Sequence, residues 1–231
     1  MIFCRLDLYF FPILDIYTPI DRTILGYKEL FSPIRRFSMK KAAVIHDLSG
    51  FGKCSLTAAI PVLSALGVQC CPVATAVLTG QTGYPCYHCT DLTAMLPDYI
   101  DAWGKNNAHF DAIYSGFLTG AKQISQVLDF IRYFREEHTL LLVDPVMGDD
   151  GNAYPFFTPG LLNGMKELTL EADVITPNLT EACLLADIPE DALLHCRTNT
   201  DLLKLAEDVA LRLQKKSLTP TGCRDHRCQM P

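Results

Sequence analysis

The chain has 231 residues, of which 49% are hydrophobic, and this is enough for one α/β domain with a sizeable core. Its formal net charge is −6, and this acidic balance argues against a nucleic-acid-binding surface. The apolar runs are all shorter than the roughly eighteen residues of a membrane span, so the sequence predicts no transmembrane segment and no membrane partner.

Ten cysteines are spread through the predicted helices and strands. We expect no secretory signal before them, because Arg5, Asp7 and Asp15 interrupt the apolar N-terminus. We therefore expect reduced, structural thiols and a cytoplasmic location. Cys86 and Cys89 have the spacing of half a zinc site, but a structural zinc site takes four ligands and the chain has no second such pair.

Residues 1–38 differ in composition from the rest of the chain. They are rich in Phe and Tyr, interrupted by prolines, and have neither a helical nor a strand period. Met39 then opens a Met-Lys-Lys start before an apolar strand, as in many cytosolic domains. We interpret Met39 as the initiator residue and 1–38 as an appendage; a genuine additional N-terminal segment is the alternative.

From Lys41 onward, apolar runs typical of buried strands alternate with amphipathic helices. Strands are predicted at 42–46, 68–77, 110–117, 139–145 and 172–178. Helices are predicted at 54–66, 91–103, 123–134, 178–187 and 199–215. In the helix at 123–134, for example, Ile124, Leu128 and Ile131 share one face. This alternation predicts a parallel sheet that is covered by helices on both faces.

Polar side chains stand where several of these strands end. His46 and Asp47 follow the first strand, Asp144 closes the strand at 139–145, and Thr176 and Asn178 close the next. Ligands of open parallel sheets bind at the C-terminal ends of the strands. The positions of these residues therefore predict an enzyme site at that edge of the sheet.

The stretch HDLSGFGKCS, which starts at His46, looks like a triphosphate-binding loop, but its spacing excludes one. Such a loop has a glycine five residues before Gly52 and Ser or Thr after the lysine, whereas this chain has Asp47 and Cys54 there. Two interpretations remain. Either Asp47 and the ring of His46 bind a small polar molecule, or the glycines only shape a tight turn in which Asp47 and Ser49 cap the next helix.

Two further stretches suit a cation or a helix cap. Asp144 is followed by Asp149 and Asp150, and carboxylates at a strand end suit Mg²⁺ bound through water and phosphate; the alternative is a solvated acidic turn. In TPNLTEA, Asn178 and Glu181 have the spacing of a capping box. The alternative places Glu181 opposite Asp149, sharing a metal-bound water.

Five segments together resemble the pyridoxal (pyridoxine, pyridoxamine) kinases of the ribokinase-like superfamily. They are HDLSGFGKCS, TAVLTGQTGY, AIYSGFL, LLVDPVMGD and DVITPNLTEA, in the family's order. The resemblance covers about 39–216 and implies a three-layer α/β/α fold with a mostly parallel central sheet, incomplete at the C-terminal end. The hydroxymethylpyrimidine kinases share the turn from Asp47 to Gly52 and are the alternative. Gln81 stands in a loop where pyridoxal kinases often have His, and this loop favours the B6 vitamer.

The resemblance also implies a reaction and site residues. ATP, with Mg²⁺, would phosphorylate the 5′-hydroxymethyl group of the vitamer, and the complete protein would be a homodimer. The vitamer side would contain His46, Asp47, Thr82, Gly83 and Phe117; the ATP side Asp144, Thr176 and Glu181; and the cation site Asp149, Asn178 and Glu181. His46 stands where relatives often have Ser, and Phe117 where some have Tyr.

One motif of the family does not occur in the 231 residues: a Gly-Thr-Gly-Asp turn whose amides bind the transferring phosphate and whose Asp is the base. In its place 217–231 is polar and patternless where a buried strand is expected. A one-nucleotide shift of one possible coding sequence from Gly222 yields an apolar strand, so we interpret this tail as a frameshift near Thr221. We therefore expect no catalytic residue and negligible kinase activity as written; a vitamer-binding protein without catalysis is the alternative.

Overall fold

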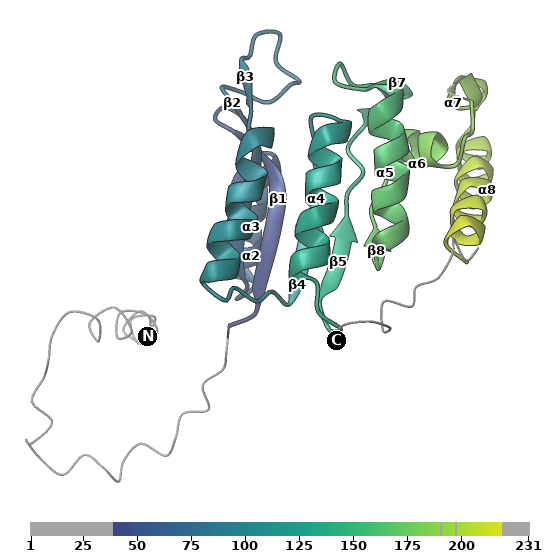
Figure 1. The fold of residues 1–231 in the computed structure, drawn as a ribbon. Coiled ribbons are helices and arrows are strands. Elements are labelled where there is room, and N and C mark those ends of the chain that lie inside the picture. The colour runs from purple at the N-terminus through teal and green to yellow at the C-terminus, as the bar shows by residue number, and fades with distance from the viewer. Residues whose placement is uncertain (1–38, 190, 197, 219–231) are drawn as a thin grey trace, which may run out of the picture. The chain divides into compact units, whose positions relative to one another are not determined.

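A six-stranded sheet forms the centre of the domain (Figure 1). The structure is a computed structural model that describes residues 39–189, 191–196 and 198–218. The predicted appendage at 1–38 and all but the first two residues of the predicted tail at 217–231 lie outside the described residues. The interpretations of those two segments therefore stay predictions.

The sheet is parallel except at one edge. Its strands are β1 (Lys41–Ser49), β2 (Gln69–Leu78), β3 (Cys89–Asp91), β4 (Ala112–Ser115), β5 (Leu140–Val143) and β8 (Val174–Ile175), in the spatial order β3-β2-β1-β4-β5-β8. β3 pairs antiparallel with β2, and the other neighbours pair in parallel. Two short strands, β6 (Gly148–Asp149) and β7 (Asn152–Ala153), form a separate antiparallel hairpin.

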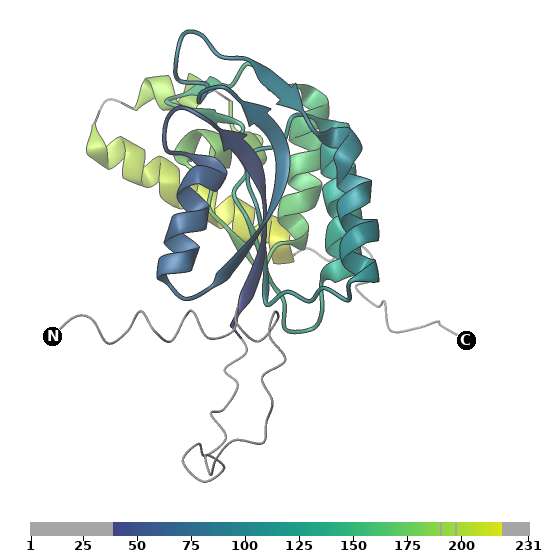
Figure 2. The same cartoon turned by 90° about the vertical axis from the view of Figure 1, so that its left-hand side faces the viewer.

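Helices cover both faces of the sheet. They are α2 (Ser55–Ala65), α3 (Leu96–Lys105), α4 (Ala121–Phe134), α5 (Pro159–Glu171), α6 (Leu179–Leu185), α7 (Asp191–His195) and α8 (Asn199–Leu218), with a 3₁₀ turn, η2, at Thr93–Met95. α3, α4 and α5 lie side by side on one face and α2 lies on the other (Figures 1 and 2). The predicted three-layer α/β/α fold is therefore confirmed. None of the described helices is long and apolar enough to cross a membrane.

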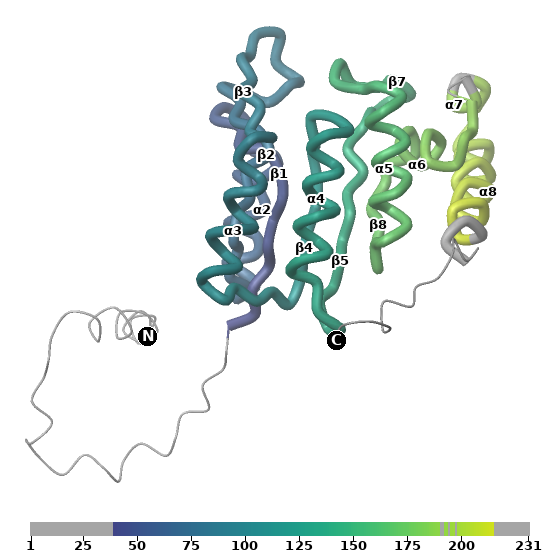
Figure 3. Tube along the Cα trace, viewed as in Figure 1, coloured from purple at the N-terminus to yellow at the C-terminus, as the bar shows by residue number. Residues whose placement is uncertain are grey.

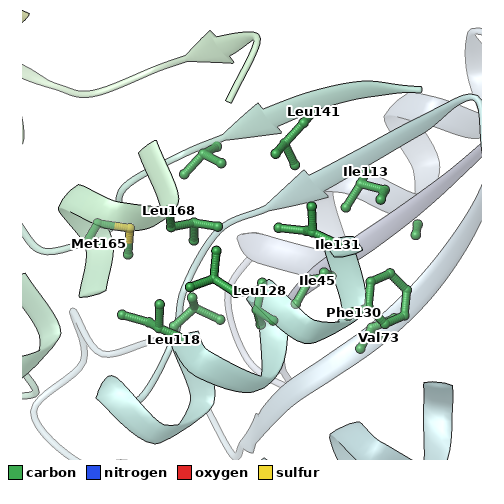
Figure 4. Packing of buried hydrophobic residues seen from close by; sticks show 14 of the residues in the cluster. Ile45, Val73, Ile113, Leu118, Leu128, Phe130, Ile131, Leu141, Met165 and Leu168 are labelled. Atoms are coloured by element: carbon green, nitrogen blue, oxygen red, sulfur yellow. The ribbon is translucent and has the colours of Figure 1, made fainter. Parts of the chain in front are cut away.

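The main core lies between the sheet and the layer of α3, α4 and α5. Figure 4 shows Ile45, Ile113 and Leu141 of the sheet facing Leu128 and Phe130 of α4. Alternate residues of β1 point the other way and pack against α2, as the two-residue period of a strand requires. Because both faces are packed, the central strands have to be apolar throughout, which is the pattern that the sequence shows.

An aromatic cluster closes the end of this core where the strands begin. The indole of Trp103 on α3 lies with its centre 5.3 Å from the ring of Phe110 and 6.0 Å from the ring of Phe130. Phe134 extends the cluster, with its ring 4.6 Å from that of Phe130. These contacts fix α3 against α4 at the end of the sheet where the strands begin. The predicted site lies at the other end, where the strands finish.

Several described elements are absent from the sequence prediction: α5, α7, the short strand β3 and the β6–β7 hairpin. α5 begins at the residue pair Thr158 and Pro159, where the Thr158 side chain accepts a hydrogen bond from the amide of Leu161 at 3.1 Å. Leu161, Met165 and Leu168 are its buried face. The cap, the proline at the helix start and the spacing of four and three were all readable in the sequence. The β6–β7 hairpin was not, because strands of two residues have no detectable period.

The predicted helix at 91–103 begins later than expected. The first of its residues, Asp91, belongs to β3, the turn η2 follows, and α3 starts only at Leu96. Pro97 explains the start, since proline fits the first turn of a helix and not its interior. β8 is likewise shorter than the predicted strand at 172–178, because Pro177 has no amide hydrogen for a ladder.

Neighbouring leucines on β5 test the assignment of the two faces. Leu141 is 0% exposed and Leu140 is 45% exposed. We expect Leu141→Ala to lower the free energy of unfolding by about 2–5 kcal/mol, because it leaves a cavity in the core. Leu140→Ala, the matched control, should cost about 1 kcal/mol or less. Urea denaturation of the two variants measures the difference, and equal losses would contradict the assignment.

Candidate active site

The loops that carry the predicted site residues lie at one end of the sheet. The C-terminal ends of β1, β4 and β5 point to that end, and the β2–β3 connection and the β6–β7 hairpin extend from it (Figure 3). Parallel packing of the strands thus brings together residues that are about a hundred positions apart in the sequence.

Backbone hydrogen bonds hold the turn after β1 against the turn after β2. The amide of Phe51 donates to the carbonyl of Thr79 at 3.1 Å, and the amide of Gln81 donates to the carbonyl of Phe51 at 2.9 Å. Gly52 adopts a φ of +93°, and a Cβ there would lie 2.9 Å from the Gln81 side chain. Glycine is therefore required at 52 for its conformation as well as for the space it leaves.

Asp47 and Ser49 do not cap the following helix. The N-cap of α2 is Cys54, whose amide donates to the Thr57 hydroxyl at 3.2 Å. The alternative in which Asp47 and Ser49 serve only as helix caps is therefore wrong. Both side chains are instead buried at the end of β1, where Asp47 contacts Ser49 and His46.

Asp47 is the centre of a buried hydrogen-bonded group. One carboxylate oxygen lies 2.9 Å from Nδ1 of His46, and the other accepts a hydrogen bond from the Ser49 hydroxyl at 2.8 Å. Burial alone would raise the pKa of Asp47, but the hydrogen bonds from His46, Ser55 and Ser49 outweigh it and hold this pKa below its ordinary value. The group therefore keeps a negative charge in a place that is 5% exposed.

The ring of His46 lies over Gly116 of the neighbouring chain segment. A Cβ at 116 would lie 2.2 Å from Cδ2 and Nε2 of this ring, so no other residue leaves room for it. The ring also meets that of Tyr114 edge to face, with centres 5.9 Å apart and planes at 78°. Tyr114 on β4 and Gly116 directly after it thus fix the position of the imidazole.

A cavity of about 170 Å³ opens beside this group. Its polar wall consists of His46, Asp47 and Ser49, and Leu78, Phe117 and Phe156 contribute its apolar wall. Pockets for drug-sized ligands measure roughly 300–1,000 Å³, so the size of this cavity suits a single small ring. A charged corner within an apolar enclosure can orient a small polar aromatic molecule.

Four of the five residues predicted on the vitamer side line this cavity: His46, Asp47, Thr82 and Phe117. Gly83 does not; it lies in the exposed loop that follows, and a Cβ there would meet no atom within 4 Å. The sequence reasoning missed Phe156, whose ring meets that of Phe117 at 5.5 Å. An aromatic run at 154–157, directly after the acidic turn, was the available signal.

The residues predicted on the ATP side form a second group. The Thr176 hydroxyl donates to Asp144 at 3.3 Å. Burial raises the pKa of Asp144, although His46 and Thr176 partly offset the shift. Burial, together with the charge of Asp144, also raises the pKa of Tyr114 to about 12. Asp144 therefore lies between the two groups, close enough to His46 and Tyr114 for their charges to interact.

Glu181 completes a capping box at the start of α6. Its two carboxylate oxygens accept hydrogen bonds from the amides of Asn178 and Met147, at 2.8 and 3.2 Å. The Asn178 side chain accepts in return from the amide of Glu181 at 3.0 Å. Burial raises the pKa of Glu181 to about 7, although these amides oppose the shift. The capping interpretation is therefore confirmed.

The residues predicted to bind a cation lie around the β6–β7 hairpin. The amide nitrogen of Asn178 donates to the carbonyl of Gly148 at 2.8 Å, and Asp149 is exposed on the hairpin. No cluster of three or more His, Cys, Asp or Glu suited to a metal ion occurs within the described ranges. Asp149 and Glu181 nevertheless offer the oxygen ligands that Mg²⁺ takes through its bound waters. This donor set fits a water-mediated ion rather than a protein cage.

The chain matches a family model and several curated sequences. The model described as Phosphomethylpyrimidine kinase matches residues 52–224. The pyridoxine/pyridoxal/pyridoxamine kinase of Bordetella avium is 34% identical over 143 residues, which cover 58% of this chain and 47% of that protein. The pyridoxal kinase of Proteus mirabilis is 30% identical over 179 residues, covering 71% of this chain and 59% of that protein. The chain therefore spans about half to three fifths of these relatives.

Solved structures share the fold. One is a protein of Bacteroides thetaiotaomicron, described as a phosphomethylpyrimidine kinase and crystallised with pyridoxal; it is 44% identical, with a TM-score of 0.68 over 75% of this chain and 60% of that one. Another is the pyridoxal kinase of Lactobacillus plantarum, 31% identical, with a TM-score of 0.64 over 76% of this chain and 60% of that one.

Substitution of Gly116 tests the position of the His46 ring. We expect Gly116→Ala to lower the free energy of unfolding by about 1–3 kcal/mol, because the new methyl group overlaps the imidazole and has to displace it. Gly83→Ala is the matched control and should change stability by about 0.5 kcal/mol or less. Denaturant titration of both variants gives the answer; a stable Gly116→Ala protein would show that the ring lies elsewhere.

Glu181 should make the stability depend on pH. Its pKa is about 7 in the folded chain against an ordinary 4.5, so the folded state holds this proton more tightly. The associated stability is present below about pH 4.5 and is lost as the pH rises through 7, a loss on the order of 3 kcal/mol. Urea denaturation between these pH values should show a flatter profile for Glu181→Gln than for the exposed control Glu167→Gln. Equal profiles would refute the assignment.

Proposed function

Because the chain belongs to the phosphomethylpyrimidine kinase family, we propose that its protein phosphorylates the 5′-hydroxymethyl group of a B6 vitamer, in vitamin B6 salvage, with ATP as the donor. Residues 39–216 are the part of the kinase domain that this chain contains. The observation that carries the proposal is the buried His46–Asp47 pair in a cavity of the size of one ring. The 44% identical protein crystallised with pyridoxal supports this choice of substrate.

On this proposal the vitamer occupies the cavity beside β1. His46 and Asp47 hydrogen-bond its polar groups, Thr82 contacts it from the rim, and the ring of Phe117 packs against it. Gly83 shapes the loop next to Thr82 and does not itself line the cavity. The apolar wall excludes water from the ring, which strengthens the polar contacts on the opposite side.

The nucleotide occupies the second group. Asp144, Thr176 and Glu181 would face the ATP, and Asp149, Asn178 and Glu181 would hold the cation. When bound, Mg²⁺ neutralises charge on the phosphoryl oxygens and orients them. The acidic residues thus serve binding, and catalysis is mainly positioning and charge neutralisation. A homodimer in the cytoplasm belongs to the same proposal.

The second candidate function is phosphorylation of hydroxymethylpyrimidine or its phosphate. The family model that matches residues 52–224 is described by that activity, and this is the specific observation in its favour. A third outcome is a protein that binds the vitamer without turnover. Binding measurements separate these cases better than turnover does, because the 231 residues contain no Gly-Thr-Gly-Asp turn.

Calorimetry on the chain tests the proposal. We expect pyridoxal to bind at least about tenfold more tightly than hydroxymethylpyrimidine, a difference of about 1.4 kcal/mol. Thr82→Ala should weaken pyridoxal binding about fivefold, which is the loss of one ordinary hydrogen bond. The control is Thr90→Ala on β3, also exposed and outside the cavity lining, which should leave affinity unchanged. Tighter binding of the pyrimidine would favour the second candidate, and no binding of either would overturn both.

A further inference from the structure

The two ring nitrogens of His46 have different surroundings. Nδ1 lies 2.9 Å from the carboxylate of Asp47, 3.0 Å from the amide nitrogen of Asp47 and 3.3 Å from that of Phe117. Nε2 makes no hydrogen bond to any residue in the described ranges. The proton on this ring therefore decides what Nε2 offers to a ligand: a lone pair if Nδ1 carries it, or an N–H group if Nδ1 does not.

Nε2 borders open space although the residue is 6% exposed. Within the described residues, the buried side-chain nitrogen and oxygen atoms without a hydrogen-bond partner are Ser115 Oγ and Gln126 Oε1. Nε2 has no partner among the described residues either, but unlike those two atoms it is not fully buried. Because His46 lines the cavity, a molecule bound there can meet Nε2 directly.

The contacts of Nδ1 compete, because one neutral nitrogen cannot donate to a carboxylate and accept from two amides. Ser49 donates to the other oxygen of Asp47, as to an ionised carboxylate, which is an acceptor only. A bare Nδ1 would then place its lone pair against that charge at 2.9 Å. A charge-assisted hydrogen bond is about twice as strong as a neutral one, so it offsets the two longer amide contacts, and the repulsion between a bare lone pair and the carboxylate decides the balance. Nδ1 carries the proton.

We propose, resting on the proposed function, that Asp47 fixes His46 in the Nδ1–H form, so that Nε2 is a hydrogen-bond acceptor that selects ligands with a donor on the ring. Besides its own contact with the vitamer, Asp47 then also positions His46, and His46 is the residue that determines specificity. His46 then offers the ligand an acceptor and no donor at Nε2. A serine at this position could not do so, because a hydroxyl group both donates and accepts. Gly116 is needed for the same arrangement of His46 and Asp47, because it leaves room for the imidazole.

The chemistry of the vitamer identifies the donor. Pyridoxal carries two hydroxyl groups, and the 5′-hydroxymethyl group is the one that receives the phosphate. The other, the ring phenol, is acidic enough to lose its proton near neutral pH, while the ring nitrogen is basic enough to hold one. The ring donor is therefore the pyridinium N–H group, and an acceptor nitrogen that is held by a buried carboxylate is suited to it. The ligand class is a hydroxypyridine whose ring nitrogen carries a proton.

Nuclear magnetic resonance of the ¹⁵N-labelled chain tests the proton position without any ligand. Long-range ¹H–¹⁵N correlations at about pH 8, where histidines are ordinarily neutral, distinguish the two tautomers. The His46 signals are identified by their loss in His46→Gln. We expect Nδ1–H in the wild-type chain and in Asp98→Asn, an exposed control on α3, and a shift toward Nε2–H in Asp47→Asn. A wild-type Nε2–H tautomer would overturn the proposal.

Ligand binding tests the consequence. Methylation of the ring nitrogen of pyridoxal removes the N–H donor and keeps the positive charge, and we expect it to weaken binding to the wild-type chain and to Asp98→Asn about tenfold near neutral pH. In Asp47→Asn the penalty should fall to about twofold or less, because Nε2 then donates. An equal penalty in all three proteins, or none in the wild type, would contradict the inference. If pyridoxal itself does not bind, the proposed function fails, and the tautomer measurement still decides the polarity of Nε2.

Discussion

The pairing of β1 with a parallel neighbour on each side is the interaction on which the rest of the structure depends. From Ala42 to Ile45 this strand is bonded to both β2 and β4, and its side chains are buried on both faces. A strand enclosed in this way can present polar groups only where it leaves the ladder. His46 and Asp47 occupy that position, and the turns after β1 and β2 are tied to each other there. The site is thus a consequence of where the central strand ends.

Burial acts to raise the pKa of three carboxylates of this region. Their hydrogen-bond partners decide whether the pKa ends above or below its ordinary value. Asp47 receives hydrogen bonds from side chains and keeps its charge, so its pKa is lowered. Asp144 has one long contact and Glu181 has two backbone amides, and burial prevails in both. The carboxylate beside the cavity therefore favours its charged form, while those of the second group take up a proton more readily. A cation or a phosphate arriving at that group would meet residues whose charge responds to it.

The sequence allowed the sheet, most of the helices and the location of the site to be predicted, because each rests on a period or on the end of a strand. Ile124, Leu128 and Ile131 recur at helical spacing and are buried as expected. The β6–β7 hairpin has no period, and the role of Phe156 depends on how that segment folds back over Phe117. The relation between His46 and Gly116 was beyond the sequence, since it arises from two strands packed side by side. The periodicity of a sequence predicts single helices and strands. Contacts between residues that are far apart in the sequence become visible only in the folded structure.

The chain contains a single tryptophan, and its place in the fold has a practical consequence. Trp103 lies in the aromatic cluster between α3 and α4, at the end of the core where the strands begin, and it does not line the cavity beside His46. Its intrinsic fluorescence is therefore an optical reporter of α3–α4 packing and is insensitive to direct quenching by a ring bound at the opposite edge. The tryptophan fluorescence can therefore follow folding, while a different signal follows the binding of a ligand to the site in the same sample.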